Sequence, residues 1–319
     1  MSNTYKVFID GQSGTTGLQI NQRLRNREDI ELVEIADADR KNSSIKKEII
    51  NSVDVAILCL PDGAARESVS LIENQHVKVL DASSAHRVHP DWVYGLPELN
   101  SGQREKIKSA RFVSVPGCYP TGFILATAPL VEAGIIPADY PVTIQAVSGF
   151  SGGGRQMIEN YEHQEDQNDF TKIWSYRPYA LQLSHKHLPE MALYTGLKHK
   201  PLFVPAVAHI KQGMLVMVPL YNHLLKNSDL SFIIETLGSR YQSEPFIHVS
   251  ALNDMDQLEN GFLSPTVCNG TNNLDVMVFA SDEQLLLVSR LDNLGKGASG
   301  AAVQNLNLML SVDESTGLV

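Results

Sequence analysis

The side chain best suited to covalent chemistry in this chain is that of Cys118. It stands in the run Ser114-Val-Pro-Gly-Cys-Tyr-Pro-Thr-Gly122, between a strand-like and a helix-like segment, and Pro120 suits a first helical turn. Unpaired backbone N–H groups at the start of a helix stabilise a thiolate there. Such a thiolate can attack an acyl carbon, expel a leaving group and form a thioester, which a dihydronicotinamide can reduce to an aldehyde. An inert core cysteine is the competing interpretation, as it is for Cys59 and Cys268.

Proton transfer in that chemistry needs a general acid or base, which is most often a histidine. Two histidines occur in the run Ser184-His-Lys-His-Leu-Pro-Glu-Met191, just before an expected helix. We rank His187 first, because Glu190 is close enough in sequence to orient it, and His185 second. His209 is a third candidate, and a structural histidine is the competing interpretation for each of them.

The chain opens on a strand-like run, a glycine-rich turn and an amphipathic helix-like run. Glycines let the backbone approach a pyrophosphate, and the start of the helix presents N–H groups to it. The GxxGxxG spacing alone is weak, but the strand–turn–helix context strengthens it, and a turn without a ligand is the alternative. The residues that this turn offers to a dinucleotide are Gly11, Ser13, Gly14, Thr15, Thr16 and Gly17.

Asp37 follows the second strand-like run, 20 residues beyond Gly17. A carboxylate there suits the ribose 2′-hydroxyl of NAD, whereas Arg40 and Lys41 could neutralise the 2′-phosphate of NADP. An ordinary surface aspartate fits the position equally well. The residues alone therefore leave the choice between NAD and NADP open.

Two later glycine-rich runs also have residues suited to binding. The run 148–155 can offer backbone N–H groups and the Arg155 guanidinium to an anion, or it can be a flexible loop. The run 293–302 contains Lys296 and Gly297 and precedes the last expected helix. Its small residues allow close approach of a cofactor, or simply of another helix.

These candidates need a fold to position them, and strand-like and helix-like runs alternate up to about residue 117. This alternation predicts an α/β fold with a doubly wound parallel sheet. The strand-like runs are Tyr5–Asp10, Ile30–Ala36, Val53–Leu60, Val77–Asp81 and Arg111–Val115, with helices expected at Gly14–Asn26 and Gly63–Glu73.

After Cys118 the pattern changes to successive strand-like runs with few helices between them. This pattern predicts an α+β domain with a mixed sheet. The strand-like runs are Val142–Val147, Leu202–Ile210, Met214–Tyr221, Asp275–Ala280 and Leu285–Leu291, with helices expected at Thr121–Ala133, Gln156–Asp169 and Ala298–Leu310.

The bulk composition agrees with an enzyme that acts on a small molecule. Apolar residues make up 43% and charged residues 19% of the 319 residues, and the formal net charge is −10. That charge disfavours nucleic acid or an anionic membrane as a partner. No apolar run approaches the roughly 20 residues of a membrane span, and no secretory signal is evident. Three cysteines without metal-like spacing predict no metal site and no disulfide framework, and hence a cytoplasmic location.

Taken together, these motifs resemble the N-acetyl-gamma-glutamyl-phosphate reductases of the short (type 2) form, which act in arginine biosynthesis. The similarity spans nearly the entire chain in family order, and its most specific parts are Pro116-Gly-Cys-Tyr-Pro-Thr121 and His185-Lys-His-Leu-Pro-Glu190. The other matching parts are the N-terminal glycine turn, Asp81-Ala-Ser-Ser-Ala-His-Arg87, Gly95-Leu-Pro-Glu98, Ser148-Gly-Phe-Ser-Gly152, Gln212-Gly-Met214 and Gly295–Gln304.

The resemblance implies NADPH-dependent reduction of an acyl phosphate, with Cys118 as the nucleophile and His187 as the acid/base. It implies a fold like that of aspartate-semialdehyde and glyceraldehyde-phosphate dehydrogenases, in which a Rossmann-like domain (1–117 plus 297–319) joins a catalytic and oligomerisation domain (118–296). It also implies that the protein is a homo-oligomer, either a dimer or a tetramer. Expected cofactor or substrate contacts are Ser83, Ser84, Arg87, Ser148, Gly152, Arg155, Lys296 and Gly297.

One position departs from the wider family. The long form has a histidine after the proline near residue 205, where this chain has Ala206. The departure weakens any assignment of catalysis to that strand and favours the 185–190 segment.

Three competing functions remain open at this point. Aspartyl phosphate or the N-acetyl-aminoadipyl homologue could be the substrate, because one methylene changes binding by only about 1–3 kcal/mol. A nucleotide-binding sensor without catalysis is the alternative from another class of protein.

Overall fold

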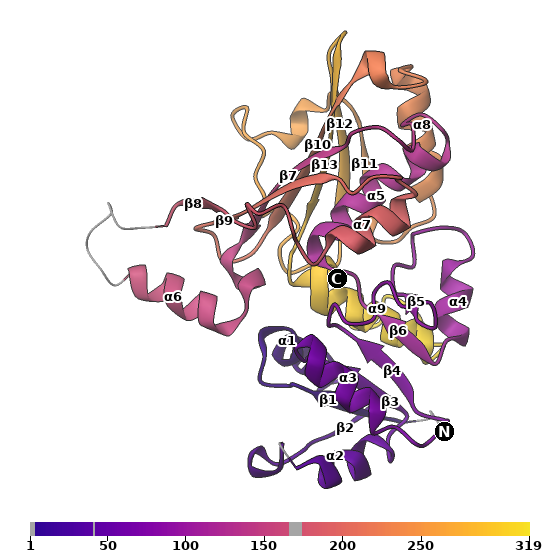
Figure 1. Ribbon diagram of the computed structural model, residues 1–319, viewed down its shortest axis with the longest axis vertical. Coiled ribbons are helices and arrows are strands. Elements are labelled where there is room, and N and C mark those ends of the chain that lie inside the picture. Colours follow the sequence, from indigo (N-terminus) through magenta and orange to yellow (C-terminus); the bar gives the residue numbers. More distant parts are fainter. Residues whose placement is uncertain (1–3, 41, 166–173) are drawn as a thin grey trace. The chain divides into compact units, whose positions relative to one another are not determined.

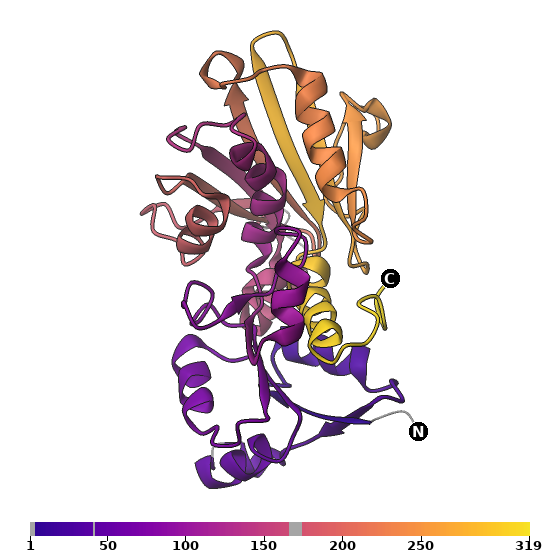
Figure 2. The same cartoon turned by 90° about the vertical axis from the view of Figure 1, so that its right-hand side faces the viewer.

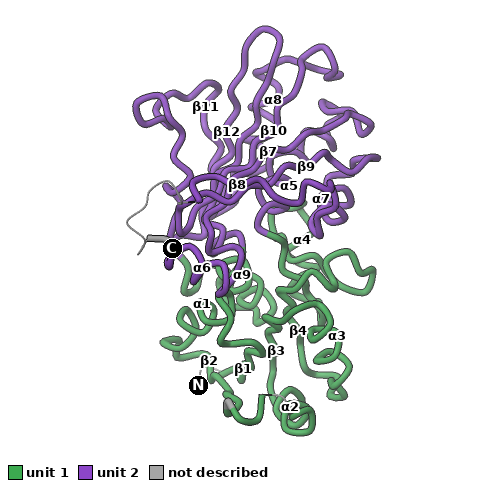
Figure 3. Tube along the Cα trace, turned by 60° about the vertical axis from the view of Figure 1, so that its left-hand side comes forward, with its two compact units in different colours: residues 1–117, 298–318 green, residues 118–297, 319 purple. Residues whose placement is uncertain are grey.

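The computed structural model describes residues 4–40, 42–165 and 174–319. The chain divides into two compact units, shown in green and purple in Figure 3. Unit 1 extends to Gly117 and resumes at Ala298–Leu318, whereas unit 2 comprises Cys118–Gly297 and Val319. Within the described residues, no helix combines the length and the apolar character that crossing a bilayer demands.

Unit 1 is built on a sheet of six parallel strands in the order β2-β1-β3-β4-β6-β5, which confirms the predicted doubly wound sheet. Its strands are β1 Tyr5–Asp10, β2 Ile30–Val33, β3 Val55–Leu58, β4 Lys78–Asp81, β5 Val93–Tyr94 and β6 Phe112–Ser114. Its helices are α1 Thr15–Leu24, α2 Ser43–Ile50, α3 Asp62–Ser70, α4 Gln103–Ser109 and α9 Gly300–Met309.

Helices cover both faces of this sheet. Alternate side chains of β1 point to opposite faces, so Val7 and Ile9 pack with α1 and α9, whereas Phe8 packs with residues of α2 and α3. Helix α9 is buried along its length and belongs to the core of unit 1. A π-helical turn, Gly295–Ser299, leads into it.

Unit 2 contains a seven-stranded mixed sheet in the order β11-β12-β13-β10-β7-β9-β8, which confirms the predicted α+β domain. Its strands are β7 Thr143–Gly149, β8 Tyr176–Pro178, β9 Leu202–Ala208, β10 Met214–Tyr221, β11 Ile247–Leu252, β12 Leu274–Ala280 and β13 Gln284–Leu291. Its helices are α5 Cys118–Glu132, α6 Arg155–Glu165, α7 Leu188–Thr195 and α8 Leu230–Tyr241.

Helices α5, α7 and α8 form a layer on one face of this sheet. Helix α5 contacts β10, β12 and β13 as well as α7 and α8, and α8 lies along the sheet beside β11 (Figure 2). Strands β9 and β8 form one edge of the sheet (Figure 1). Helix α6 begins one residue earlier than expected, and the last part of the expected helix, residues 166–169, lies outside the described residues.

Candidate active site

The glycine-rich turn of unit 1 has the geometry expected of a phosphate-binding turn. Gly11 follows β1 with φ +90°, a conformation that favours glycine, and a Cβ there would collide with the backbone oxygen of Cys59. Gly14 is the N-cap of α1, and a Cβ on Gly17 would collide with the backbone oxygen of Gly11. The turn therefore brings bare backbone to the N-terminus of α1, which fits the pyrophosphate of a dinucleotide.

The hydroxyl groups of this turn lie at its surface. Ser13 is exposed, and Thr15 and Thr16 in the first turn of α1 are half-buried. The N–H groups at the start of a helix lack carbonyl partners within the helix, so they remain available to an anion. Asp37 begins the short 3-10 helix Asp37–Asp39, four residues beyond β2, and Lys41 lies outside the described residues.

The serines that follow β4 donate to carboxylates. The Ser83 hydroxyl donates to Oδ2 of Asp81 (2.7 Å), and the Ser84 hydroxyl donates to both carboxylate oxygens of Asp62 (2.9 Å each). Arg87 is buried, and its guanidinium donates to the backbone oxygens of Val115 (2.9 Å) and Ala82. A role of these three residues toward a ligand stays a prediction.

Cys118 is the first residue of α5 and is half-buried. The thiol thus lies at the positive end of the dipole of a 15-residue helix, which favours a thiolate. A Cβ on Gly297 would lie 2.8 Å from Cβ of Cys118, so only glycine leaves the cysteine room at this position. The surroundings of Cys118 therefore suit a nucleophile.

The other two thiols are unsuited to that role. Burial, together with the charges of Asp81 and Asp10, raises the pKa of Cys59 to about 12. Burial and the Asp275 carboxylate raise the pKa of Cys268 to about 12, and its Sγ donates to that carboxylate (3.3 Å). Both thiols stay protonated near neutral pH and are poor nucleophiles.

His185 and His187 lie beside the aromatic ring of Tyr119, the residue after Cys118. Their ring centroids are 6.2 Å and 6.0 Å from that of Tyr119, and 4.6 Å from each other. His187 is buried at the N-cap of α7, whereas His185 is half-buried. The backbone N–H of His187 donates to Nδ1 of His185 (3.2 Å), which places the proton of a neutral His185 on Nε2.

The remaining residues expected to act in proton transfer lie in two different places. Glu190 is buried in the first turn of α7. The pKa of Tyr194 is raised mainly by the burial of that tyrosine and further by the charge of Glu190. His209 instead packs against Phe150 and Tyr161, with ring centroids 6.0 Å and 5.5 Å away. The structure therefore gathers His185 and His187, and not His209, around Tyr119.

The 148–155 run is a braced segment rather than a loose loop. Ser148 is buried, and Gly152 is exposed next to its hydroxyl. The side chain of Asn293 links this segment to Gly213, the residue before β10. Its Nδ2 donates to Ser151 (3.0 Å), and its Oδ1 accepts from the N–H of Gly213 (2.9 Å). Arg155 is exposed on α6.

Arg155 and Lys296 both have neighbours of their own. The Arg155 guanidinium donates to Glu159 on the same helix (2.7 Å). Lys296 is fully buried, with its ammonium 5.8 Å from the ring centroid of Phe246. Contacts of these two side chains with substrate or cofactor stay predictions.

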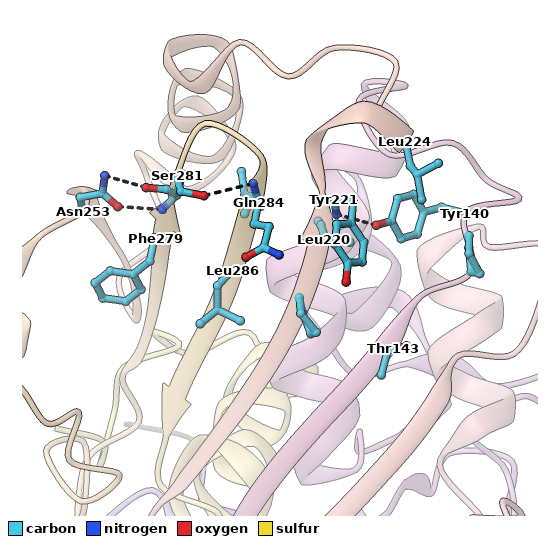
Figure 4. A pocket seen from close by; sticks show the side chains of 14 residues that line it. Tyr140, Thr143, Leu220, Tyr221, Leu224, Asn253, Phe279, Ser281, Gln284 and Leu286 are labelled. Carbon is cyan, nitrogen blue, oxygen red and sulfur yellow. Dashed lines mark hydrogen bonds between the residues drawn. The ribbon is translucent and has the colours of Figure 1, made fainter.

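A cavity of about 680 Å³ lies in unit 2, at the end of the sheet away from Ser148 and Asn293 (Figure 4). It lies where β10 ends at Tyr221 and β13 begins at Gln284, whereas the opposite ends of these strands lead toward Ser148 and Asn293. None of the described residues that line it carries a charge, and Phe279 and Leu286 contribute apolar surface. An anion such as an acyl phosphate does not suit this cavity.

Tyr179 stands outside the motifs from which the site residues were predicted. Its hydroxyl donates to that of Tyr119 (3.4 Å), and its ring lies 5.7 Å from that of His185. The Cys118 charge contributes to the raised pKa of both tyrosines, after burial as the main cause. Tyr179 thus belongs to the cluster around Cys118.

Comparison with known proteins first defines the class. Residues 6–110 match the semialdehyde dehydrogenase NAD binding domain, and residues 118–293 match the semialdehyde dehydrogenase dimerisation domain. Solved structures of the same fold include aspartate semialdehyde dehydrogenase II from Vibrio cholerae (17% identical, TM-score 0.70) and a probable aspartate-semialdehyde dehydrogenase from Pseudomonas aeruginosa (15%, TM-score 0.71). Both comparisons cover 97% of this chain and 99% of the other. The chain is therefore an oxidoreductase of the semialdehyde dehydrogenase class.

Closer relatives then define the family. N-acetyl-gamma-glutamyl-phosphate reductase from Trichormus variabilis is 53% identical over 99% of this chain and 100% of its own length. The enzyme of that name from Burkholderia ambifaria is 48% identical over 96% of each chain. The chain belongs to the N-acetyl-gamma-glutamyl-phosphate reductase family, which confirms the resemblance of its motifs. These matches support NADP as the cofactor.

Proposed function

We propose that this protein reduces N-acetyl-gamma-glutamyl phosphate to N-acetylglutamate semialdehyde, with release of phosphate, in the biosynthesis of arginine. The observation that carries the proposal is that His185 and His187 lie beside Tyr119, the residue after Cys118 at the start of α5, in a chain 53% identical to a reductase of that name. The thiol of this reaction needs a reducing compartment, so we place the protein in the cytoplasm.

Cys118 would act as the nucleophile. Its sulfur bonds to the acyl carbon, the carbon–oxygen bond to phosphate breaks, and a thioester with Cys118 remains. When NADPH is bound, it supplies the hydride that reduces this thioester. The carbon–sulfur bond then breaks, the aldehyde leaves, and the thiolate returns to the positive end of α5.

The histidine pair would hold and move the proton that this sequence of steps requires. His185 presents a half-buried ring beside Tyr119 with its Nδ1 already accepting a backbone N–H, so its Nε2 can exchange a proton with a bound substrate. His187 is more deeply buried and would orient His185. The geometry thus favours His185, although the sequence ranks His187 first.

The residues of unit 1 would bind the cofactor. The bare backbone of the Gly11–Gly17 turn and the N-terminus of α1 fit the pyrophosphate, with Ser13, Thr15 and Thr16 as hydroxyl donors. Ser83 and Ser84 could bind the cofactor only by exchanging their present partners, Asp81 and Asp62. We expect Arg87, Ser148 and Arg155 to bind the anionic substrate.

The test is oxidation of N-acetylglutamate semialdehyde by the purified protein in the presence of phosphate, followed as NADPH formation. We expect turnover that requires phosphate and is faster with NADP⁺ than with NAD⁺. The semialdehydes of aspartate and of N-acetyl-aminoadipate should react more slowly. Equal or faster reaction of either one would reassign the substrate, and absence of turnover with all three would favour a nucleotide-binding sensor.

We further propose that two copies of the chain associate through the face of the unit 2 sheet opposite α5. Leu215, Met277 and Val288 form an apolar cluster there that is buried within the chain, and Leu263 packs against it and is only partly buried. The neighbouring residue, Phe262, is 77% exposed, which is unusual for a large apolar side chain. The match to a dimerisation domain over 118–293 supports a second copy as the partner.

Phe262→Asp should therefore convert the dimer to a monomer, because the substitution puts a charge into a face that association buries. Sedimentation or light scattering measures the mass. Leu193→Asp is the matched control, since Leu193 is a comparably exposed leucine (57%) on α7, which packs against α5. Dissociation by the Leu193 variant and not by the Phe262 variant would place the contact on the helical layer instead.

A further inference from the structure

Two tyrosine hydroxyl groups lie next to each other beside Cys118. The hydroxyl of Tyr119 donates to the backbone oxygen of Ala206 (3.2 Å), and the hydroxyl of Tyr179 donates to that of Tyr119 (3.4 Å). The backbone N–H of Tyr179 donates to the oxygen of Pro205 (3.0 Å). Strand β9 therefore anchors both tyrosines, although they come from α5 and from the segment after β8.

Tyr179 is the member of this pair that a substrate can reach. It is 37% exposed, whereas Tyr119 is 3% exposed with its proton directed at a backbone oxygen. The 3.4 Å separation of the two hydroxyl oxygens is well beyond the usual O–H···O distance of about 2.7–2.8 Å. The Tyr179 proton is thus weakly held, and it can turn to a better acceptor at small cost.

The surroundings also keep that proton on Tyr179. Partial burial raises the pKa of Tyr179 to about 12 against the lowering effect of its hydrogen bond with Tyr119, and the Cys118 charge contributes to the rise. A thiolate at Cys118 therefore makes ionisation of the phenol harder, not easier. Tyr179 remains a hydrogen-bond donor over the whole pH range in which the enzyme is expected to work.

We propose that Tyr179 is a further catalytic residue, whose hydroxyl donates a hydrogen bond to the acyl oxygen of the substrate when the sulfur of Cys118 attacks. As the carbon–sulfur bond forms, the π electrons of the carbonyl move onto its oxygen, and the Tyr179 hydroxyl stabilises the negative charge there. When the bond to phosphate breaks, these electrons return to the carbonyl. Tyr179 keeps its proton throughout. This inference rests on the proposed acyl-phosphate chemistry.

The position of His185 agrees with this role. Its ring is in edge contact with that of Tyr179, with centroids 5.7 Å apart, and it also contacts Tyr119 and Phe203. The donor to the acyl oxygen and the proposed proton carrier are thus neighbours, so both can face one reacting group. Phenylalanine at position 179 would keep the ring contact and remove only the hydroxyl.

Tyr179→Phe is the decisive variant. We expect its kcat to fall by about 10²-fold with KM for the acyl phosphate nearly unchanged, because a transition-state donor is lost. The rate of Cys118 alkylation by iodoacetamide, measured against pH, should match that of the wild type, since Tyr179 does not activate the thiol. Thermal unfolding checks that the fold is intact.

Tyr176→Phe is the matched control, an exposed tyrosine of β8 three residues away, and it should behave as the wild type. A Tyr179→Phe enzyme with wild-type kcat would overturn the inference, as would a rise in KM alone or a shifted alkylation profile. If kcat falls by about 10²-fold in Tyr119→Phe and stays at the wild-type value in Tyr179→Phe, the role belongs to Tyr119. If the wild type and Tyr176→Phe both fail to reduce the acyl phosphate, the proposed function itself is wrong and this inference falls with it.

Discussion

Cys118→Ser is expected to lower turnover by roughly 10⁴-fold or more, because an alcohol ionises far less readily than a thiol and is a much weaker nucleophile near neutral pH. Cys118 is the first residue of α5, and its side chain lies against Gly297. Because serine is smaller than cysteine, the substitution should not move the backbone. Binding of NADPH, measured by the change in its fluorescence, should stay within about twofold of the wild type. Loss of cofactor binding in this variant would mean that the cysteine is structural.

The control for this experiment is Cys268→Ser. Cys268 is also in unit 2, but it is buried and donates to Asp275, a bond that a serine hydroxyl can replace. A thiol with a pKa of about 12 is only about one part in ten thousand thiolate at pH 8. Iodoacetamide should therefore label Cys118 first and inactivate the Cys268→Ser enzyme at the wild-type rate. Inactivation without modification of Cys118 would contradict this assignment.

Short-range signals allowed the sequence to predict the parts of the site that lie within one strand–turn–helix segment. Gly11 needs a positive φ, and Gly17 must lack a Cβ where α1 passes the turn, so the glycine spacing reports the backbone directly. Cys118 follows the same logic, because the glycine before it and the proline two residues after it mark the start of α5. Local covalent geometry determines such positions, and no knowledge of the fold is needed.

Long-range contacts were invisible to the same reasoning. Tyr119 and Tyr179 are 60 residues apart in the sequence. They meet because both donate a hydrogen bond to a backbone oxygen of β9, Tyr119 through its hydroxyl and Tyr179 through its backbone N–H. The exposed run from Tyr176 to Tyr179 has no periodicity that separates the tyrosine at the site from the one at the surface. Only the pairing of the edge strand decides which hydroxyl meets that of Tyr119.

The glycines near residue 296 show how one pattern can have two causes. A Cβ on Gly295 would collide with the backbone oxygen of Thr271, and one on Gly297 would crowd Cys118. Close packing therefore accounts for both glycines without a cofactor. Lys296 lies between them, with its ammonium near the ring of Phe246, a residue 50 positions earlier that no local pattern connects with it.

Secondary structure was predicted well where burial is complete and less well at element ends. All four residues of β3 are buried, and an apolar run of that kind identifies a central parallel strand. The expected strand Ile30–Ala36 ends instead at Val33, because pairing with β1 stops at Phe8↔Val33. Strand length there depends on the neighbouring strand, which the apolar run itself does not encode.

His185→Asn is expected to lower turnover by about 10²–10⁴-fold, the usual contribution of a general acid or base. The half-buried ring of His185 has its Nδ1 held by the backbone N–H of His187, and that bond persists when the side chain at 187 is changed. His187→Asn should therefore cost less, about tenfold, through the orientation of its neighbour. Asparagine is a good N-cap residue, so the start of α7 should survive that substitution.

The pH dependence of kcat separates a proton carrier from a residue that only positions it. Loss of the carrier removes the limb of the profile that reports its titration, whereas loss of a positioning residue lowers the whole profile and keeps its shape. We expect the first result for His185→Asn and the second for His187→Asn. His209→Asn, whose ring lies among Phe150 and Tyr161, should leave both rate and profile unchanged. The reverse order of effects would give the proton to His187, as the sequence predicts, and would require its buried ring to reach the substrate.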